Sequence, residues 1–117
     1  MKIAIAGAAG RMGQMLIRRI GATEGCSLAG AIEAAGSNAL GRDASEVAGL
    51  EKGGVKITSD SAAAIGAANV VIDFTVPAAT VAHAKIAAEK GVAMVIGTTG
   101  LDPQQTALIH AAAKNVP

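Results

Sequence analysis

Three glycines spaced by threes, Gly7, Gly10 and Gly13, follow a short apolar run at the start of the chain. Residues 2–6 alternate β-branched and small apolar side chains, a pattern typical of a buried strand. Beyond the glycines, apolar side chains recur at helical spacing as far as Gly21, at Met12, Met15, Leu16 and Ile20. The glycines are therefore predicted to form the turn between a strand and a helix, so the fold should begin with a β-turn-α unit.

The remainder of the chain continues this alternation of strands and helices. Apolar runs predict further strands at residues 26–33, 55–58, 70–74 and 92–96. Capping and stop signals predict helices at residues 43–46, 61–68, 77–89 and about 102–114. Such alternation predicts a single α/β domain over residues 1–117, a Rossmann-type doubly wound parallel sheet with strand order 3-2-1-4-5 and helices on both faces.

The composition excludes several classes of protein. With 51% hydrophobic residues and a net charge of +1, the chain is neither disordered nor suited to bulk electrostatic binding of nucleic acid or membrane surfaces. No run approaches the ~20 apolar residues of a membrane helix, and the apolar segment 3–9 leads straight into the turn, which favours a first strand over a signal peptide. The single cysteine, Cys26, is expected to be a small buried hydrophobe and favours the cytoplasm.

The glycine turn has the chemistry of a phosphate site. Gly7 permits a sharp turn, Gly10 lets backbone N–H groups approach a diphosphate, and Gly13 lets the helix pack closely on the strand. The helix N-terminus then offers unpaired donors to the phosphates. Glu33 ends the second predicted strand 20 residues beyond Gly13, the distance at which a carboxylate reaches the ribose hydroxyls. Dinucleotide binding is the favoured interpretation.

Two further turns are expected at the same crevice, because ligands bind beyond the carboxyl ends of parallel strands. These are "DFTV" at residues 73–76 and "GTT" at residues 97–99. His83 and His110 fall within predicted helices without an acid or cysteine at catalytic spacing, so we interpret both as packing or surface residues. The sequence contains no metal-ligand constellation and no nucleophile with a partner base, and no catalytic residue is predicted in this chain.

The segments "IAIAGAAGRMG", "DFTVP" and "VIGTTG" together closely resemble the dihydrodipicolinate reductase family. The resemblance implies an NAD(P)H-dependent oxidoreductase of diaminopimelate and lysine biosynthesis. It implies that Gly7 to Met12 hold the diphosphate, that Glu33 holds the adenosine ribose, and that Thr99 also lies near the substrate. The cofactor-binding residues implied in this way are Gly7, Ala8, Ala9, Gly10, Arg11, Met12, Glu33, Phe74, Thr75, Gly97, Thr98 and Thr99.

In this family a substrate domain follows, with a His-His…Lys motif and a Ser-Gly-Thr turn that bind a cyclic dicarboxylate and donate a proton. Neither motif occurs in these 117 residues, and the sequence stops where a sixth strand is expected. We therefore expect the family's cofactor domain alone, without the C-terminal substrate and tetramerisation domain. The full-length protein is expected to be a homotetramer.

The cofactor is expected to be NADH or NADPH, with a preference for NADH. Some family members carry an arginine after the ribose-binding acid, suited to a 2′-phosphate, and here that position is Ala34. Some carry a basic residue where this chain has Val76, so Arg11 remains as the phosphate partner. Two alternatives stay open: a CoA-binding domain of the succinyl-CoA synthetase type, disfavoured because Glu33 would repel the ribose phosphate of CoA, and a non-catalytic dinucleotide-binding module.

Overall fold

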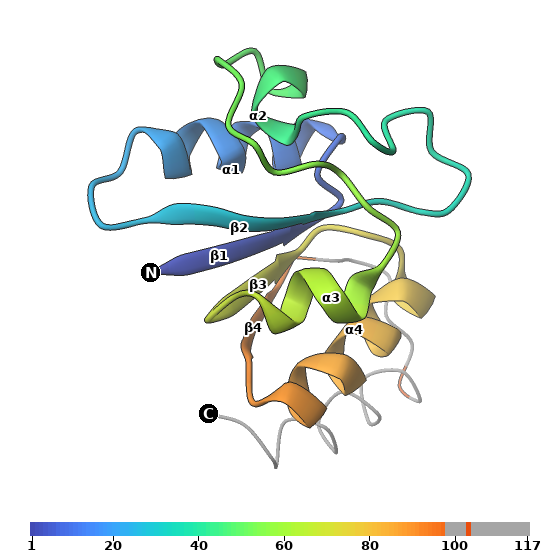
Figure 1. Ribbon diagram of the computed structural model, residues 1–117. Coiled ribbons are helices and arrows are strands. Elements are labelled where there is room, and N and C mark those ends of the chain that lie inside the picture. Colours follow the sequence, from blue (N-terminus) through green and yellow to red (C-terminus); the bar gives the residue numbers. More distant parts are fainter. Residues whose placement is uncertain (98–102, 104–117) are drawn as a thin grey trace.

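In the computed structural model, which describes residues 1–97 and Pro103, the chain folds into a parallel sheet between two layers of helices (Figure 1). The described strands are β1 (Lys2–Ala6), β2 (Ser27–Ile32), β3 (Val70–Asp73) and β4 (Ala93–Ile96), in the order β2-β1-β3-β4. The described helices are α1 (Arg11–Gly21), α2 (Ala44–Val47), α3 (Ser61–Gly66) and α4 (Pro77–Lys90). Helices α1 and α2 cover one face of the sheet and α3 and α4 the other, which confirms the Rossmann-type prediction.

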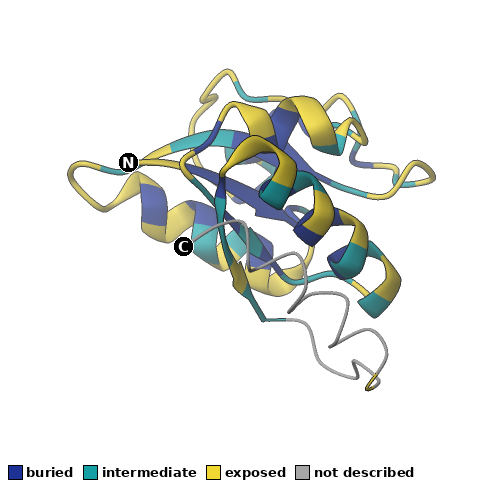
Figure 2. Cartoon of the chain, turned by 90° about the horizontal axis from the view of Figure 1, so that it is seen from below, coloured by how far each residue is buried: buried dark blue, intermediate teal, exposed yellow. Residues whose placement is uncertain are grey.

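The first strand occupies the centre of the sheet and separates two apolar cores. β1 pairs with β2 on one side, where Lys2 lies opposite Ser27, and with β3 on the other. Because side chains alternate along a strand, Ile3 and Ile5 enter the core under α1 and α2, whereas Ala4 and Ala6 enter the core under α3 and α4. Figure 2 shows the sheet buried between helices whose outer faces are exposed.

The predicted strand over residues 55–58 is corrected to two isolated bridges, a parallel one between Thr58 and Ile32 of β2 and an antiparallel one between Lys56 and Asp43. Thr58 uses both backbone groups toward β2, since its N–H donates to the Ala31 carbonyl at 2.9 Å and its carbonyl accepts from Glu33. Just before it, the N–H of Ile57 donates to the Arg42 carbonyl at 2.9 Å. The segment divides its hydrogen bonds between the sheet edge and a loop, so no longer ladder forms there.

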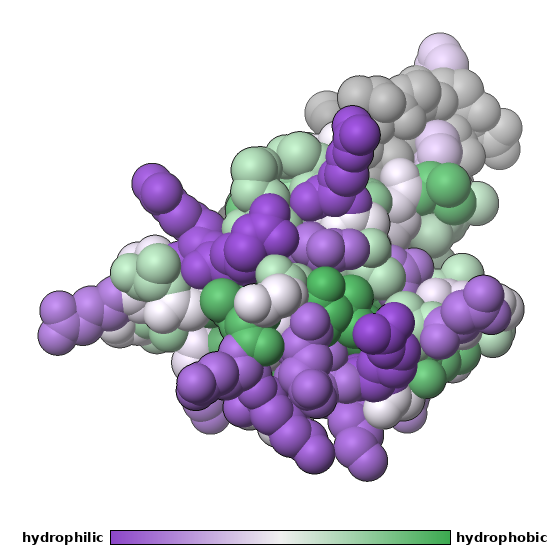
Figure 3. Space-filling model, turned by 90° about the horizontal axis from the view of Figure 1, so that it is seen from above, coloured by the Kyte–Doolittle hydropathy of each residue, from purple (hydrophilic) through white to green (hydrophobic). Residues whose placement is uncertain are grey.

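Helix α1 is rotated relative to the apolar face predicted for it. Met12 and Met15 are exposed, whereas the buried positions are Gly13, Ile17 and Ile20. Gly13 packs directly on the turn that precedes the helix, and this contact sets which side of α1 faces the sheet. Figure 3, viewed from the side of α1 and α2, shows hydrophilic side chains over most of this face with small apolar patches between them.

Three predictions concern residues outside the described part of the chain: the helix over 102–114, the threonines Thr98 and Thr99, and His110. Helix α4 begins at Pro77 as predicted and ends at Lys90, where the following residue, Gly91, has a φ of 68° that stops the helix. At 14 residues it is the longest described helix.

None of the helices within residues 1–97 has the length and apolar character needed to cross a membrane.

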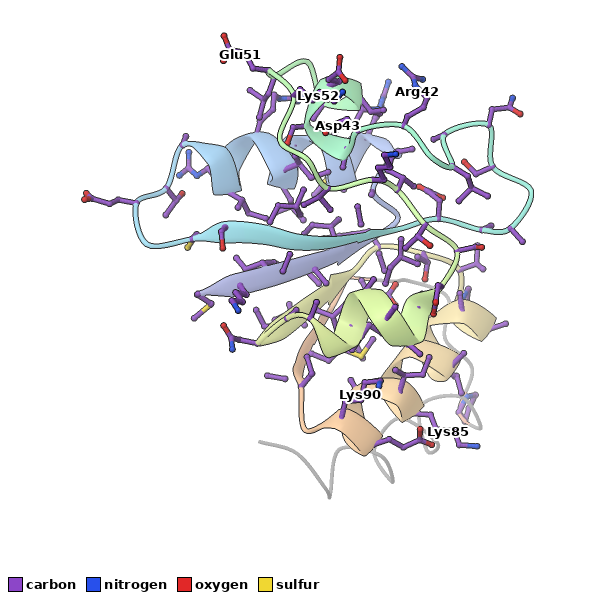
Figure 4. The ribbon with its side chains drawn as sticks, viewed as in Figure 1. Arg42, Asp43, Glu51, Lys52, Lys85 and Lys90 are labelled. Atoms are coloured by element: carbon purple, nitrogen blue, oxygen red, sulfur yellow. The ribbon has the colours of Figure 1, made fainter. Side chains whose placement is uncertain are left out.

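Asp43 organises the loop around α2, on the side of the sheet covered by α1 (Figure 4). Its carboxylate caps α2 by accepting from the N–H of Glu46 at 3.1 Å, as the capping signal predicted. It also accepts from the N–H groups of Gly53 at 3.1 Å and Gly54 at 2.7 Å. These backbone hydrogen bonds, that of Gly53 foremost, hold the pKa of Asp43 below its ordinary value.

We expect Asp43→Asn to remove part of the acid sensitivity of folding. A carboxylate whose pKa is lower in the folded state stabilises the fold above its unfolded pKa, about 3.9, and loses this contribution as the pH falls through the folded pKa. The variant should therefore have a lower urea midpoint than the wild type at pH 7, and the difference should narrow at pH 3. Glu51→Gln, at a side chain that points into solvent in Figure 4, should follow the wild type at both pH values. An unchanged midpoint at pH 7 would contradict the role of Asp43.

Candidate functional site

The glycine turn connects β1 to α1 and is hydrogen-bonded to the end of β2. The N–H groups of Gly7 and Ala8 both donate to the Ile32 carbonyl, at 3.0 and 3.2 Å, so the turn is fixed to the last residue of β2. Gly7 has a φ of 85°, a conformation that L side chains rarely adopt, and a Cβ there would lie 2.5 Å from the Phe74 carbonyl oxygen. The close approach of the turn to the end of β3 therefore requires glycine at this position.

The other two glycines differ in their surroundings. A Cβ on Gly13 would lie 2.1 Å from the Gly7 carbonyl oxygen, so α1 packs on the turn without room for a side chain. A Cβ on Gly10 would meet only that same oxygen, at 3.4 Å, and the residue is exposed with ordinary backbone angles. Gly10 is also the N-cap of α1, where the first N–H groups have no partner within the helix. The turn thus leaves free space where a ligand would meet these donors.

Two adjoining hollows open beside the turn and form one crevice at the carboxyl ends of the strands. The larger, of about 570 Å³, extends over Glu33, Ala34 and the start of α3 and α4. The smaller, of about 280 Å³, extends over Arg11, Met12 and Gly97. Both are lined by the same four residues: Gly7, Gly10, Phe74 and Thr75. A ligand with two ends joined by a narrow middle, as in a dinucleotide, fits this arrangement.

Glu33 lies at the rim of the larger hollow and also supports the turn. Its Oε2 accepts a hydrogen bond from the Ala9 N–H at 2.8 Å. A carboxylate offers about four acceptor positions on its two oxygens, so Glu33 retains acceptor capacity beyond this bond. The sequence predicted the location of Glu33 beside the turn, and the bond to Ala9 adds a second role that spacing did not indicate.

A buried polar network adjoins the larger hollow, and two of its members, Ser61 and His83, also line that hollow. The fully buried Asp73, last residue of β3, accepts through Oδ1 from the Thr75 N–H at 2.9 Å and the Thr75 hydroxyl at 2.5 Å. The Thr80 hydroxyl donates to the same oxygen at 3.3 Å. Oδ2 lies 2.7 Å from His83 Nδ1, and His83 Nε2 lies 3.1 Å from the Ser61 hydroxyl. The network links β3, α4 and the first residue of α3.

The expectation that His83 lacks an acid partner is therefore wrong. His83 is buried as a packing residue, but Asp73, ten residues earlier and on another element, pairs with its imidazole. Burial works to raise the pKa of Asp73, and hydrogen bonds from His83 and Thr75 outweigh it, so the pKa lies below the ordinary value. With Asp73 ionised, Nδ1 of His83 faces an acceptor and therefore carries a proton, while Nε2 pairs with the Ser61 hydroxyl.

Most of the predicted site residues converge on the crevice. Ala8 is fully buried in the core, and the Ala9 N–H is bonded to Glu33, so these two contribute to the turn rather than to the crevice lining. The residues that line the larger hollow but were not among the predicted cofactor-binding residues are Ile32, Ala34, Ala35, Ser59, Ser61, Val76, Ala79 and His83. The described residues hold no group of three side chains suited to a metal ion.

The sheet order, the turn after β1 and the crevice at the strand ends define a nucleotide-binding domain of the Rossmann type. The family described as "Dihydrodipicolinate reductase, N-terminus" matches residues 1–117. The chain belongs to this family.

Curated relatives agree with the family over nearly the whole chain. The chain is 53% identical over 116 residues to a 4-hydroxy-tetrahydrodipicolinate reductase of Cupriavidus pinatubonensis, covering 99% of this chain and 43% of the relative. It is 49% identical over 116 residues to the protein of that name from Anaeromyxobacter dehalogenans, with the same two coverages. A third, from Bradyrhizobium diazoefficiens, is 50% identical over 109 residues, 93% of this chain and 40% of the relative. The chain thus spans about two fifths of the length of these relatives.

Proposed function

We propose that this chain is the cofactor-binding domain of an NAD(P)H-dependent reductase that converts 4-hydroxy-tetrahydrodipicolinate to tetrahydrodipicolinate in diaminopimelate and lysine biosynthesis. The observation that carries the proposal is the crevice itself, built on a glycine turn in a chain that matches the reductase family from end to end. The bound nicotinamide supplies the hydride. Residues that bind the dicarboxylate and donate the proton are assigned to the part of the relatives that this chain does not cover.

The crevice residues fit a dinucleotide at three points. The open space at Gly10 and the donors of the first turn of α1 suit a diphosphate. The remaining acceptor capacity of Glu33 suits the ribose hydroxyls in the larger hollow. Gly97 lines the smaller hollow and is followed by Thr98 and Thr99, which we assign to the nicotinamide end, with Thr99 nearest the substrate.

Titration calorimetry on the 117-residue chain tests the proposal. We expect saturable binding of NADH, no measurable binding of CoA, and no reduction of the cyclic dicarboxylate by the chain alone. Saturable binding of CoA without binding of NADH would instead identify a CoA-binding domain. Turnover by a chain whose mass is verified would contradict the assignment of the proton donor to the uncovered part.

The wild-type chain should bind NADH at least as well as NADPH, and Ala34→Arg should shift the preference toward NADPH. A 2′-phosphate would place negative charge beside Glu33, and Ala34, which lines the same hollow, cannot neutralise it. A charged hydrogen bond from arginine contributes about 1.5–3 kcal/mol, equivalent to roughly a tenfold or larger change in the ratio of the two dissociation constants. Both constants should be measured at one ionic strength. A tenfold wild-type preference for NADPH would refute this assignment.

The proposal includes a homotetrameric full-length protein that acts in the cytoplasm, because the family resemblance implies that assembly and that compartment. Light scattering on the full-length protein tests the assembly. A monomer at micromolar concentration would contradict it.

A further inference from the structure

The buried pair of Asp73 and His83 is not among the residues assigned to the cofactor above, although the imidazole of His83 lines the larger hollow. Asp73 is fully buried and His83 is 6% exposed. Their facing atoms, Oδ2 and Nδ1, lie 2.7 Å apart. Burying a carboxylate away from water costs free energy unless the carboxylate is hydrogen-bonded, so the buried Asp73 is expected to serve a role at this position.

We propose that Asp73 and His83 are positioning residues that hold the Phe74–Thr75 wall of the crevice in the conformation that receives the dinucleotide. The inference rests on the proposed function, because it concerns how the same crevice is kept in shape. Neither side chain is required to react with the ligand.

The contacts of Asp73 determine where the wall lies. Through Oδ1 it accepts from both the N–H and the hydroxyl of Thr75, which fixes the two residues that follow β3. The backbone on either side is bonded as well, since the Phe74 N–H donates to the Ala6 carbonyl at 3.0 Å and the Gly97 N–H donates to the Asp73 carbonyl at 2.8 Å. Phe74 and Thr75 line both hollows, so their position defines the width of the crevice.

The wall and the glycine turn also touch. The Phe74 carbonyl oxygen occupies the space that a side chain on Gly7 would need, since a Cβ on Gly7 would lie only 2.5 Å from it. A shift of the wall would therefore move the turn that we assign to the diphosphate. Packed interiors transmit such displacements because they contain little free space.

His83 holds the Asp73 carboxylate in position through Oδ2, the oxygen that does not bond to Thr75 in the contacts above. It reaches across from α4, with Nδ1 at 2.7 Å from Oδ2, while Nε2 bonds to Ser61 at the start of α3. Without the imidazole, a fully buried carboxylate would lose this partner on Oδ2 and would be expected to turn toward water or take up a proton. Rotation would release Thr75, and protonation would make Oδ1 a weaker acceptor for the two Thr75 donors.

Two substitutions at His83 separate the hydrogen bond to Asp73 from the bulk of the ring. His83→Leu fills much of the space but cannot donate, whereas the side-chain amide of His83→Asn places a donor near the position of Nδ1. Titrating the folded chains with NADH, we expect about a tenfold weaker affinity for the leucine variant and an affinity within about threefold of wild type for the asparagine variant. Val92→Ala is the control, since it removes buried volume at the opposite end of β4 and should leave the affinity unchanged.

A measurement without ligand keeps this inference separate from the proposed function. Hydrogen exchange followed by NMR should show the Thr75 amide protected in the wild type and in His83→Asn, and exposed in His83→Leu. The wild-type imidazole should carry a proton on Nδ1. If the wild type fails to bind NADH, the proposed function fails, and the Thr75 amide alone then decides the positioning role.

A folded His83→Leu chain that binds NADH as the wild type does, or that protects Thr75 equally, refutes the proposal. So does an asparagine variant as weak as the leucine variant. If His83→Leu does not fold, His83→Asn decides: retained affinity with a protected Thr75 amide supports the proposal, and a tenfold loss overturns it.

Discussion

Replacing Gly10 by valine should give a folded chain that has lost most of its affinity for NADH and NADPH alike. The backbone angles at Gly10, φ −76° and ψ 173°, suit valine, and the nearest atom to an added Cβ is 3.4 Å away. Valine is a poorer N-cap than glycine, so stability should fall by about 1 kcal/mol. The branched side chain would fill the space beside the first-turn donors of α1. Loss of one charged hydrogen bond of about 2 kcal/mol corresponds to roughly a thirtyfold weaker affinity.

Calorimetry with both cofactors, together with circular dichroism of the same sample, measures this effect. The two affinities should fall by the same factor, because the diphosphate is common to NADH and NADPH. Gly66→Ala, in α3 beside the flexible Lys90 side chain, is the matched glycine control and should bind as the wild type does. Unchanged NADH affinity in a folded Gly10→Val chain would mean that the turn is not the phosphate site.

Gly13→Ala should have the opposite outcome and destabilise the fold severely. In an exposed helix, exchanging glycine for alanine stabilises by about 1 kcal/mol. Here the added methyl group would lie 2.1 Å from the Gly7 carbonyl oxygen and 2.8 Å from the Ala8 Cα, both backbone atoms of a turn that is fixed to Ile32. Either α1 or the turn must move, so we expect a loss of about 3 kcal/mol or more.

Urea denaturation of Gly13→Ala and Gly66→Ala tests this contrast. Gly66→Ala should be neutral or slightly stabilising, because the neighbouring atoms belong to a lysine side chain that can move aside. A Gly13→Ala chain as stable as the wild type would show that α1 does not pack on the turn as described.

Local patterns were sufficient to predict the elements whose signals are local. The alternation in residues 2–6 and the proline and glycine that bound α4 predicted those elements within a residue or two. The segment 55–58 has the composition of a strand, but whether it forms a ladder depends on the loop at Arg42, which competes for its hydrogen bonds. Sequence periodicity carries no information about that competition.

In the candidate site, too, local spacing predicts some features and misses others. The turn and Glu33 were predicted because their spacing in the chain reflects one β-α-β unit. The pairing of Asp73 with His83 was missed because it joins the end of a strand to the second turn of the following helix, a distance of ten residues that matches no helical or strand period. An acid at a strand end followed by a buried histidine in the next helix is the signal that would have indicated it.

The central position of β1 has a consequence for synthesis on the ribosome. Strand β1 is synthesised before both of its partners, since Ile3 pairs with Leu28 of β2 on one side and with Val70 of β3 on the other. At a synthesis rate of about 5–20 residues per second, β3 becomes available several seconds after β1 and β2. During that interval the nascent chain carries an apolar strand with one edge unpaired, which is the kind of edge that associates with other chains. Dilute expression and binding by chaperones should therefore matter more for this domain's yield than its final stability suggests.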